Sequence, residues 1–95
     1  MFMKNNLADN LTPIQRNIKH IDAKLSDKAV VICYADRITA EQSILHLEQM
    51  QGKLGIDRVE YVFSQENFNV IIYFKRHYAL EEFNEALNPA HYLVA

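Results

Sequence analysis

The chain has 95 residues, of which 49% are hydrophobic and 23% are charged, and its formal net charge is −2. This size and composition predict one folded domain whose core needs neither metal nor disulfide support, and they exclude a disordered tail. The single cysteine excludes an internal disulfide, and no apolar run approaches the roughly 20 residues that span a bilayer. Since the first residues also lack the pattern of a signal peptide, we expect a cytoplasmic protein without a membrane segment.

Residues 12–25 carry the pattern of an amphipathic helix. Thr12, Pro13 and Gln15 fit a helix start, with a capping threonine, a proline in the first turn and a glutamine that can reach back to the cap. Four apolar residues then follow at alternating spacings of four and three: Ile14, Ile18, Ile21 and Leu25. Such a stripe must be buried, either across the chain's own sheet or against a second copy of the chain. We therefore predict an N-terminal arm and helix over residues 1–27, and both alternatives stay open.

Residues 28–95 are expected to form a βαββαβ core. Continuous apolar runs at 30–34 and 70–74 are typical of strands covered on both faces, whereas the partly alternating run at 58–63 indicates a strand with one wet face. Strands are thus predicted at 30–35, 56–64 and 68–75, with a short closing strand at 91–95.

Two helices complete this core. The first is expected after a capping box that begins at Thr39, with Gly52 as its stop, and the second runs from about Tyr78 to Leu87. The element order is that of a ferredoxin-like α+β sandwich, which has a four-stranded antiparallel sheet with its first and third strands in the centre. The whole chain is predicted to be one domain, in which the N-terminal helix is an addition to the core.

The sequence contains no recognisable constellation of catalytic residues or metal ligands. Its four histidines lie at no metal-ligand spacing, and a second cysteine for a paired motif is missing. Cys33 lies inside the most apolar strand, where a buried thiol is expected rather than a nucleophile. We therefore expect neither an enzyme nor a bound cofactor or metal.

Residues 30–35, Val-Val-Ile-Cys-Tyr-Ala, and residues 67–74, Asn-Phe-Asn-Val-Ile-Ile-Tyr-Phe, resemble in order and spacing the two RNP motifs of an RNA recognition motif. The resemblance implies RNA binding by aromatic side chains on the outer face of the sheet. In this chain Asn69 and Ile71 stand at two of the aromatic places. An RNA-binding mode would therefore be noncanonical, and its candidate residues are Tyr34, Arg58, Tyr73 and Lys75.

A protein partner is the preferred functional hypothesis. Glu81, Glu82 and Glu85 lie opposite the apolar side of the last helix, where they form either a solvated face or a docking surface for a basic partner. We expect a small non-catalytic protein-binding module that acts as a regulator, adaptor or inhibitor of a larger machine, an anti-CRISPR-like inhibitor from a phage or mobile element being one case. RNA binding is the alternative. A homodimer through the sheet face or the N-terminal helix is compatible with either.

Overall fold

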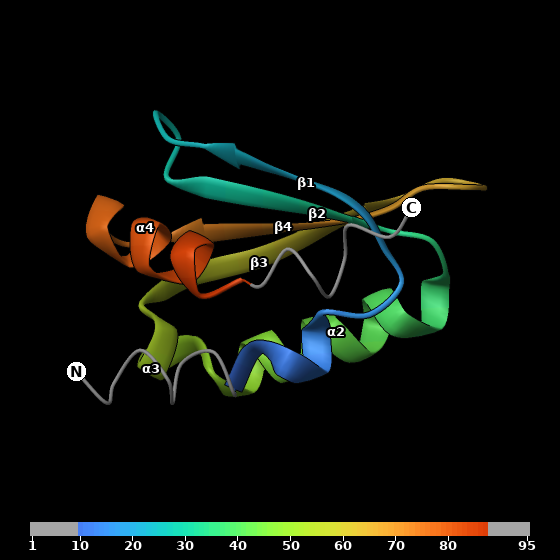
Figure 1. The fold of residues 1–95 in the computed structure, drawn as a ribbon, viewed down its shortest axis with the longest axis horizontal. Helices are drawn as coiled ribbons and strands as arrows, with labels where there is room; N and C mark the ends of the chain where they lie inside the picture. The colour runs from blue at the N-terminus through green and yellow to red at the C-terminus, as the bar shows by residue number, and fades with distance from the viewer. Residues whose placement is uncertain (1–9, 88–95) are drawn as a thin grey trace.

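A four-stranded antiparallel sheet with helices packed on one face forms the body of the protein (Figure 1). The computed structural model describes residues 10–87. In chain order the elements are the 3₁₀ turn η1 (Thr12–Ile14), β1 (Ile18–Lys24), β2 (Ala29–Tyr34), α2 (Arg37–Gln49), α3 (Gln51–Leu54), β3 (Ile56–Phe63), β4 (Phe68–Phe74) and α4 (His77–Ala86).

The two most apolar strands, β2 and β4, lie in the centre of the sheet, as predicted. The strand order is β1-β2-β4-β3, and each neighbouring pair is antiparallel. Along β2, the side chains of Val30, Ile32 and Tyr34 belong to the core under the helices and are fully buried. The intervening Val31 and Cys33 must point to the other face, because side chains alternate along a strand. Apolar residues therefore occupy both faces of β2, which explains its continuous apolar run.

The predicted N-terminal helix is wrong. Asn10 and Leu11 are helical and the turn η1 follows them, but Ile18–Lys24 pair with β2 as an edge strand. Residues 1–9 of the predicted N-terminal arm lie outside the described residues. A register shift between Ile18 and His20 inserts one extra residue into β1, so Ile18 and Ile21 both face the core although they are three residues apart. The spacing that suggested a helix is therefore equally compatible with a bulged strand. A homodimer seam made of two such helices loses its basis over Ile18–Lys24, because this segment is a strand of the sheet, and self-association of the chain stays a prediction.

β1 also changes the topology of the domain. It occupies the edge beside β2, where the expected βαββαβ order would place its closing strand. That closing strand was predicted over residues 91–95, which lie outside the described residues. From β1 to α4 the order is ββαββα, which results when the last strand of βαββαβ is moved to the front. The α+β class and the four-stranded antiparallel sheet are confirmed, whereas a ferredoxin-like arrangement is not.

The first long helix begins three residues earlier than predicted. The cap is Asp36, whose Oδ1 accepts a hydrogen bond from the backbone N–H of Thr39 at 2.8 Å, while its Oδ2 accepts one from the side chain of Asn17 at 2.6 Å. At the other end α2 is followed directly by α3, and Gly55 at φ 71° ends that turn. The left-handed stop is therefore Gly55 and not Gly52, which lies inside α3.

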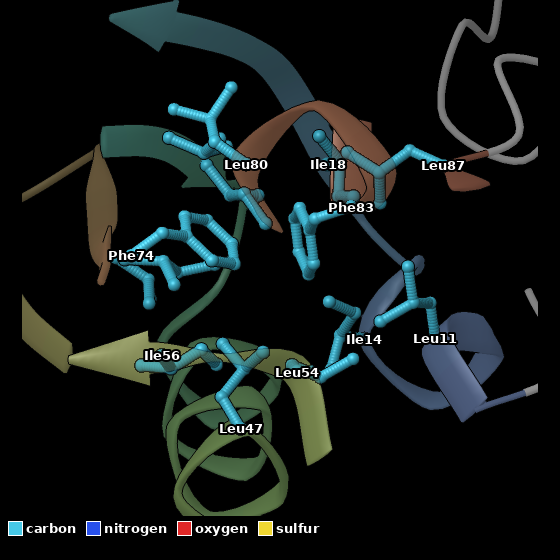
Figure 2. Close-up of a cluster of buried hydrophobic side chains, with 14 of the residues drawn as sticks. Leu11, Ile14, Ile18, Leu47, Leu54, Ile56, Phe74, Leu80, Phe83 and Leu87 are labelled. Carbon is cyan, nitrogen blue, oxygen red and sulfur yellow. The ribbon is translucent and has the colours of Figure 1, made fainter. Parts of the chain in front are cut away.

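The core fills the space between the sheet, α2 and α4 (Figure 2). Phe74 of β4 and Phe83 of α4 meet near its middle, with ring centroids 5.2 Å apart. Leu11 and Ile14 reach the same cluster from the segment before β1, and both are fully buried. The last helix is confirmed with its predicted inner side, since Phe83 and Leu87 are only 1% and 3% exposed.

Within residues 10–87, no helix covers the second face of the sheet (Figure 1). We call this the open face. By strand alternation and register, its centre consists of Val31, Ile71 and Tyr73, which are partly exposed. The two edge strands add polar residues at its margins, namely His20, Asp22 and Lys24 on β1 and Arg58 and Glu60 on β3. The open face thus combines an apolar centre with charged borders.

Candidate interaction surfaces

Tyr34, a candidate RNA contact in the sequence, does not reach the surface. Its ring points under the helices, and its exposed fraction is 0%. The hydroxyl donates a hydrogen bond to the backbone carbonyl of Ile14 at 2.6 Å, and burial raises its pKa well above the ordinary tyrosine value. Tyr34 is therefore a structural residue that ties the segment before β1 to the sheet, and its expected role in binding is corrected.

Three other candidates, Arg58, Tyr73 and Lys75, come together at one end of the open face. They line an open hollow of about 600 Å³ at the ends of β3 and β4, with Lys28 beside them. Arg58 and Tyr73 are cross-strand partners, and the guanidinium carbon lies 3.9 Å from the centre of the tyrosine ring. The sequence therefore selected residues that form one surface, although Tyr34 is not part of it.

The charge of Arg58 is already partly neutralised. Its Nε lies 3.0 Å from a carboxylate oxygen of Glu60, and one of its terminal nitrogens lies 3.1 Å from Asp57. Hydrogen bonding to Glu60, with a smaller contribution from Asp57, raises the pKa of the Arg58 guanidinium. Together with the contact to Tyr73, these pairs hold the guanidinium over the ring, where it covers one face of the aromatic system.

The acidic candidates lie on a separate surface. Glu81, Glu82 and Glu85 are exposed on α4, on the side away from its buried residues. Glu81 lies 3.6 Å from the ring of His77 one turn earlier. Because α4 packs on the helix-bearing side of the sheet, these carboxylates do not share a surface with the cluster at Tyr73.

The sequence did not reveal a groove between α2 and the edge strand β3. It has a volume of about 340 Å³, and its mainly apolar walls include Ile44 and Leu45 from the helix and Tyr61 and Phe63 from the strand. We call it the α2–β3 groove. Leu45 is 61% exposed and Tyr61 is 60% exposed, which is unusual for large apolar side chains. The only signal in the sequence was that Leu45 falls outside the inward positions of its helix.

A salt bridge borders the α2–β3 groove. Arg37 and Glu41 are four residues apart on α2, and their side chains meet at 2.9 Å. The Arg37 guanidinium also lies 5.6 Å from the ring centre of Phe63 on the strand. The groove therefore has apolar walls, and the two charges at its border, Arg37 and Glu41, neutralise each other. This arrangement suits an apolar ligand better than an ionic one.

Cys33 is buried as expected, with 1% exposure, and its Sγ lies 3.5 Å from Oδ1 of Asn67. Within residues 10–87, no three side chains of histidine, cysteine, aspartate or glutamate are grouped so that they could hold a metal ion. None of the helices in this part of the chain has the length and apolar content needed to cross a bilayer.

Comparisons of the chain with protein families, with curated proteins and with solved structures found no match.

Proposed function

We propose that the chain is a small non-catalytic protein-binding module, which acts as a regulator, adaptor or inhibitor by docking a partner in the α2–β3 groove. One observation carries this proposal. Among the described residues, six large hydrophobic side chains are exposed, and two of them, Leu45 of α2 and Tyr61 of β3, line the same groove. Clustering of exposed apolar residues on adjacent elements is a mark of interaction sites rather than of ordinary solvated surface.

The backbone of β3 favours a partner that adds a strand to the sheet. The N–H of Ser64 donates to the carbonyl of Asn67 at 2.9 Å, so Ser64 and Asn67 form a hydrogen-bonded pair of the β3–β4 hairpin. Along β3, every second residue before Ser64 then bonds to β4 in the same way. In an antiparallel ladder, Val59, Tyr61 and Phe63 then direct their N–H and C=O groups away from β4. Since β3 is the edge strand, no strand within residues 10–87 pairs with these groups.

A strand added at this edge would also fill the groove. Side chains opposite Tyr61 and Phe63 would lie on the helix side, because paired residues point to the same face of a sheet. They would pack against Leu45 of α2, while the alternate side chains would face Glu60 and Val62. We therefore expect the partner segment to be extended, with an apolar residue at every second position.

A capture experiment tests this function. Wild-type protein is used to capture partners from a lysate of the organism that encodes the chain, with and without nuclease. The same capture is made in parallel with the variants Leu45→Glu, Tyr61→Pro and Tyr61→Thr. A stoichiometric protein partner should survive nuclease and be lost with Leu45→Glu. The partner should also be lost with Tyr61→Pro, because proline removes the outward N–H of residue 61 without breaking a hydrogen bond to β4. Tyr61→Thr keeps this N–H and should retain more of the partner than Tyr61→Pro does.

The matched control is Val62→Glu, which introduces the same charge at a residue of similar exposure on the opposite face of β3. Capture that is equal for Leu45→Glu and wild type would contradict docking in the groove. Light scattering of the purified protein tests self-association, and a dimer dissociated by Tyr61→Pro would show that a second copy occupies the edge. The cytoplasmic location expected from the sequence stays a prediction.

Noncanonical RNA binding is a second candidate, and one observation favours it. Arg58, Tyr73 and Lys75, which the resemblance to an RNA recognition motif singled out, line the same hollow. If a base stacks on Tyr73, then Tyr73→Ala should weaken the binding of a single-stranded RNA by about 1–3 kcal/mol. An unchanged affinity in a fluorescence anisotropy titration would exclude this mode.

A further inference from the structure

An open hollow of about 790 Å³ lies between the β1–β2 turn and the start of α4, lined by residues 25, 26, 28 and 75–78. We call it the basic hollow, because Lys28, Lys75, Arg76 and His77 line it and none of its lining residues carries a carboxylate. Its two walls are joined by a hydrogen bond of 2.8 Å from the backbone N–H of Phe74 to the carbonyl of Lys28. The backbone that carries these cations is therefore held in place.

The cations of the basic hollow are not neutralised by the rest of the described chain. Lys28, Lys75 and Arg76 form no side-chain hydrogen bond or ion pair with any residue between 10 and 87. His77 differs, since its ring contacts Glu81. These three cations, which have no side-chain partner among residues 10–87, produce a positive potential on the side of Arg76, while Asp27 and Asp57 border the adjoining hollow that Lys28 and Lys75 also line. The basic hollow therefore favours an anionic ligand.

The basic hollow is also partly apolar. Leu25 is 50% exposed and Tyr78 is 60% exposed, and both line it. They are the two exposed large hydrophobic side chains among the described residues that do not belong to α2 or β3. A ligand that fits this surface must offer negative charges to the lysines and the arginine, and an apolar group to the leucine and the tyrosine.

We propose that the basic hollow binds an acidic peptide segment of a partner protein. Carboxylates of the segment meet Lys28, Lys75 and Arg76, and an apolar side chain packs between Leu25 and Tyr78. This complementarity of charge and apolar surface provides both attraction and orientation. The basic hollow is formed by different residues from the α2–β3 groove, so this proposal does not depend on the proposed function. Two separate docking surfaces would suit an adaptor.

A peptide fits this surface better than a nucleic acid does. Tyr78 offers a ring on which one base could stack, but Leu25 beside it offers only an aliphatic surface, which an apolar side chain of a peptide can use and a second stacked base cannot. Glu81, Glu82 and Glu85 follow on the same helix whose first turn lines the hollow, and they would repel a phosphate chain that extends along α4. A short acidic segment can instead stay within the basic hollow.

The test uses fluorescence anisotropy with a labelled hexapeptide of sequence Glu-Glu-Leu-Phe-Glu-Glu, titrated with the full chain at low salt. The same titration is made with a labelled oligouridine and with a peptide in which lysine replaces each glutamate. The variants are Lys75→Glu, Arg76→Glu and Leu25→Ser. The matched control is Lys53→Glu, an exposed lysine of α3 that does not line the basic hollow.

We expect the acidic peptide to bind, with an affinity that falls as salt is added. Lys75→Glu and Arg76→Glu should each weaken binding by about five-fold or more, because reversal replaces an attraction with a repulsion. Leu25→Ser should weaken it as well, whereas Lys53→Glu and the groove variant Leu45→Glu should change it by less than about two-fold.

Four results would overturn the proposal. The first is no binding of the acidic peptide at concentrations up to about 1 mM. The second is an equal loss of affinity for the acidic peptide in Lys75→Glu and Lys53→Glu, which would show that the peptide is attracted to the whole chain and not to the basic hollow. The third is tighter binding of the lysine peptide. The fourth is tighter binding of oligouridine that is lost in Arg76→Glu, which would assign the basic hollow to nucleic acid, since Arg76 does not line the hollow at Tyr73.

Discussion

Replacing Tyr34 with phenylalanine removes a single hydroxyl group from the interior of the protein. This hydroxyl donates to the carbonyl of Ile14 at 2.6 Å, and the side chains of both residues are fully buried. A tyrosine hydroxyl is protonated at neutral pH in any case, and burial raises the pKa of Tyr34 further, so the hydroxyl remains a donor. In Tyr34→Phe the carbonyl of Ile14 loses this partner in a place that water does not readily reach. An unsatisfied buried acceptor of this kind costs about 1–3 kcal/mol.

The expected loss of stability is large enough to measure. At about 2 kcal/mol, and with a Tm change of about 4–8 °C per kcal/mol for a domain of this size, Tm should fall by about 8–16 °C. Thermal and urea unfolding followed by circular dichroism measure the change, and an unaltered urea m-value would show that the folded and unfolded states keep their compactness.

The same chemical change at a surface position provides the control for this experiment. Tyr61 is 60% exposed, so Tyr61→Phe should alter the free energy of unfolding by less than about 0.5 kcal/mol. If Tyr34→Phe proves as stable as Tyr61→Phe, the reasoning that places Tyr34 among the structural residues is refuted. A stable Tyr34→Phe that loses RNA binding would instead restore the role expected from the sequence.

Three further substitutions test the turns and the edge strand. Asp36→Ala should destabilise the protein by about 1 kcal/mol through loss of the helix cap. Hydrogen bonding to the helix backbone lowers the pKa of Asp36, so its contribution is complete above the unfolded pKa of about 3.9 and disappears as pH falls through the lower folded value. Urea unfolding of wild type and of Asp36→Ala measures the difference between their free energies of unfolding. This difference should be smaller at acidic pH than at neutral pH, and a difference that does not change with pH would contradict this account. Gly55→Ala should cost at least about 1–2 kcal/mol, since φ is 71° and the new Cβ would lie 3.1 Å from that of Ala79. Gly52→Ala, which has open space around it, is the thermal-unfolding control and should not destabilise. Ile18→Glu should destabilise the monomer by about 2–5 kcal/mol, because the side chain is 7% exposed in the core, and a change of oligomeric state without loss of Tm would refute the placement of β1.

The surfaces could be predicted from the sequence only in part. Arg58, Tyr73 and Lys75 were found because they lie at the ends of two strands whose pairing in a hairpin was already evident. The α2–β3 groove could not be predicted from the sequence, because Leu45 and Tyr61 are brought together only by the packing of a helix on a distant strand. Lys28 and Arg76 were missed for a similar reason, since the hollow they share depends on where the β1–β2 turn lies relative to α4.

The sequence by itself determined the centre of the sheet and the last helix. The runs 30–34 and 70–74 are apolar on both faces, a pattern typical of central strands, and the three- and four-residue spacing of Leu80, Phe83 and Leu87 favours a helix packed against that sheet. Local pattern was sufficient in these elements because burial favoured a single secondary structure.

Only the tertiary structure decided the conformation of residues 18–24 and the direction of Tyr34. A bulge lets Ile18 and Ile21 share a face in a strand, so their spacing cannot distinguish strand from helix, and the choice follows from the hydrogen bonds that the free edge of β2 offers. Likewise, a strand with two apolar faces does not reveal which face meets the helices. Tyr34 points inward because there its hydroxyl finds the carbonyl of Ile14, a partner twenty residues away in the sequence.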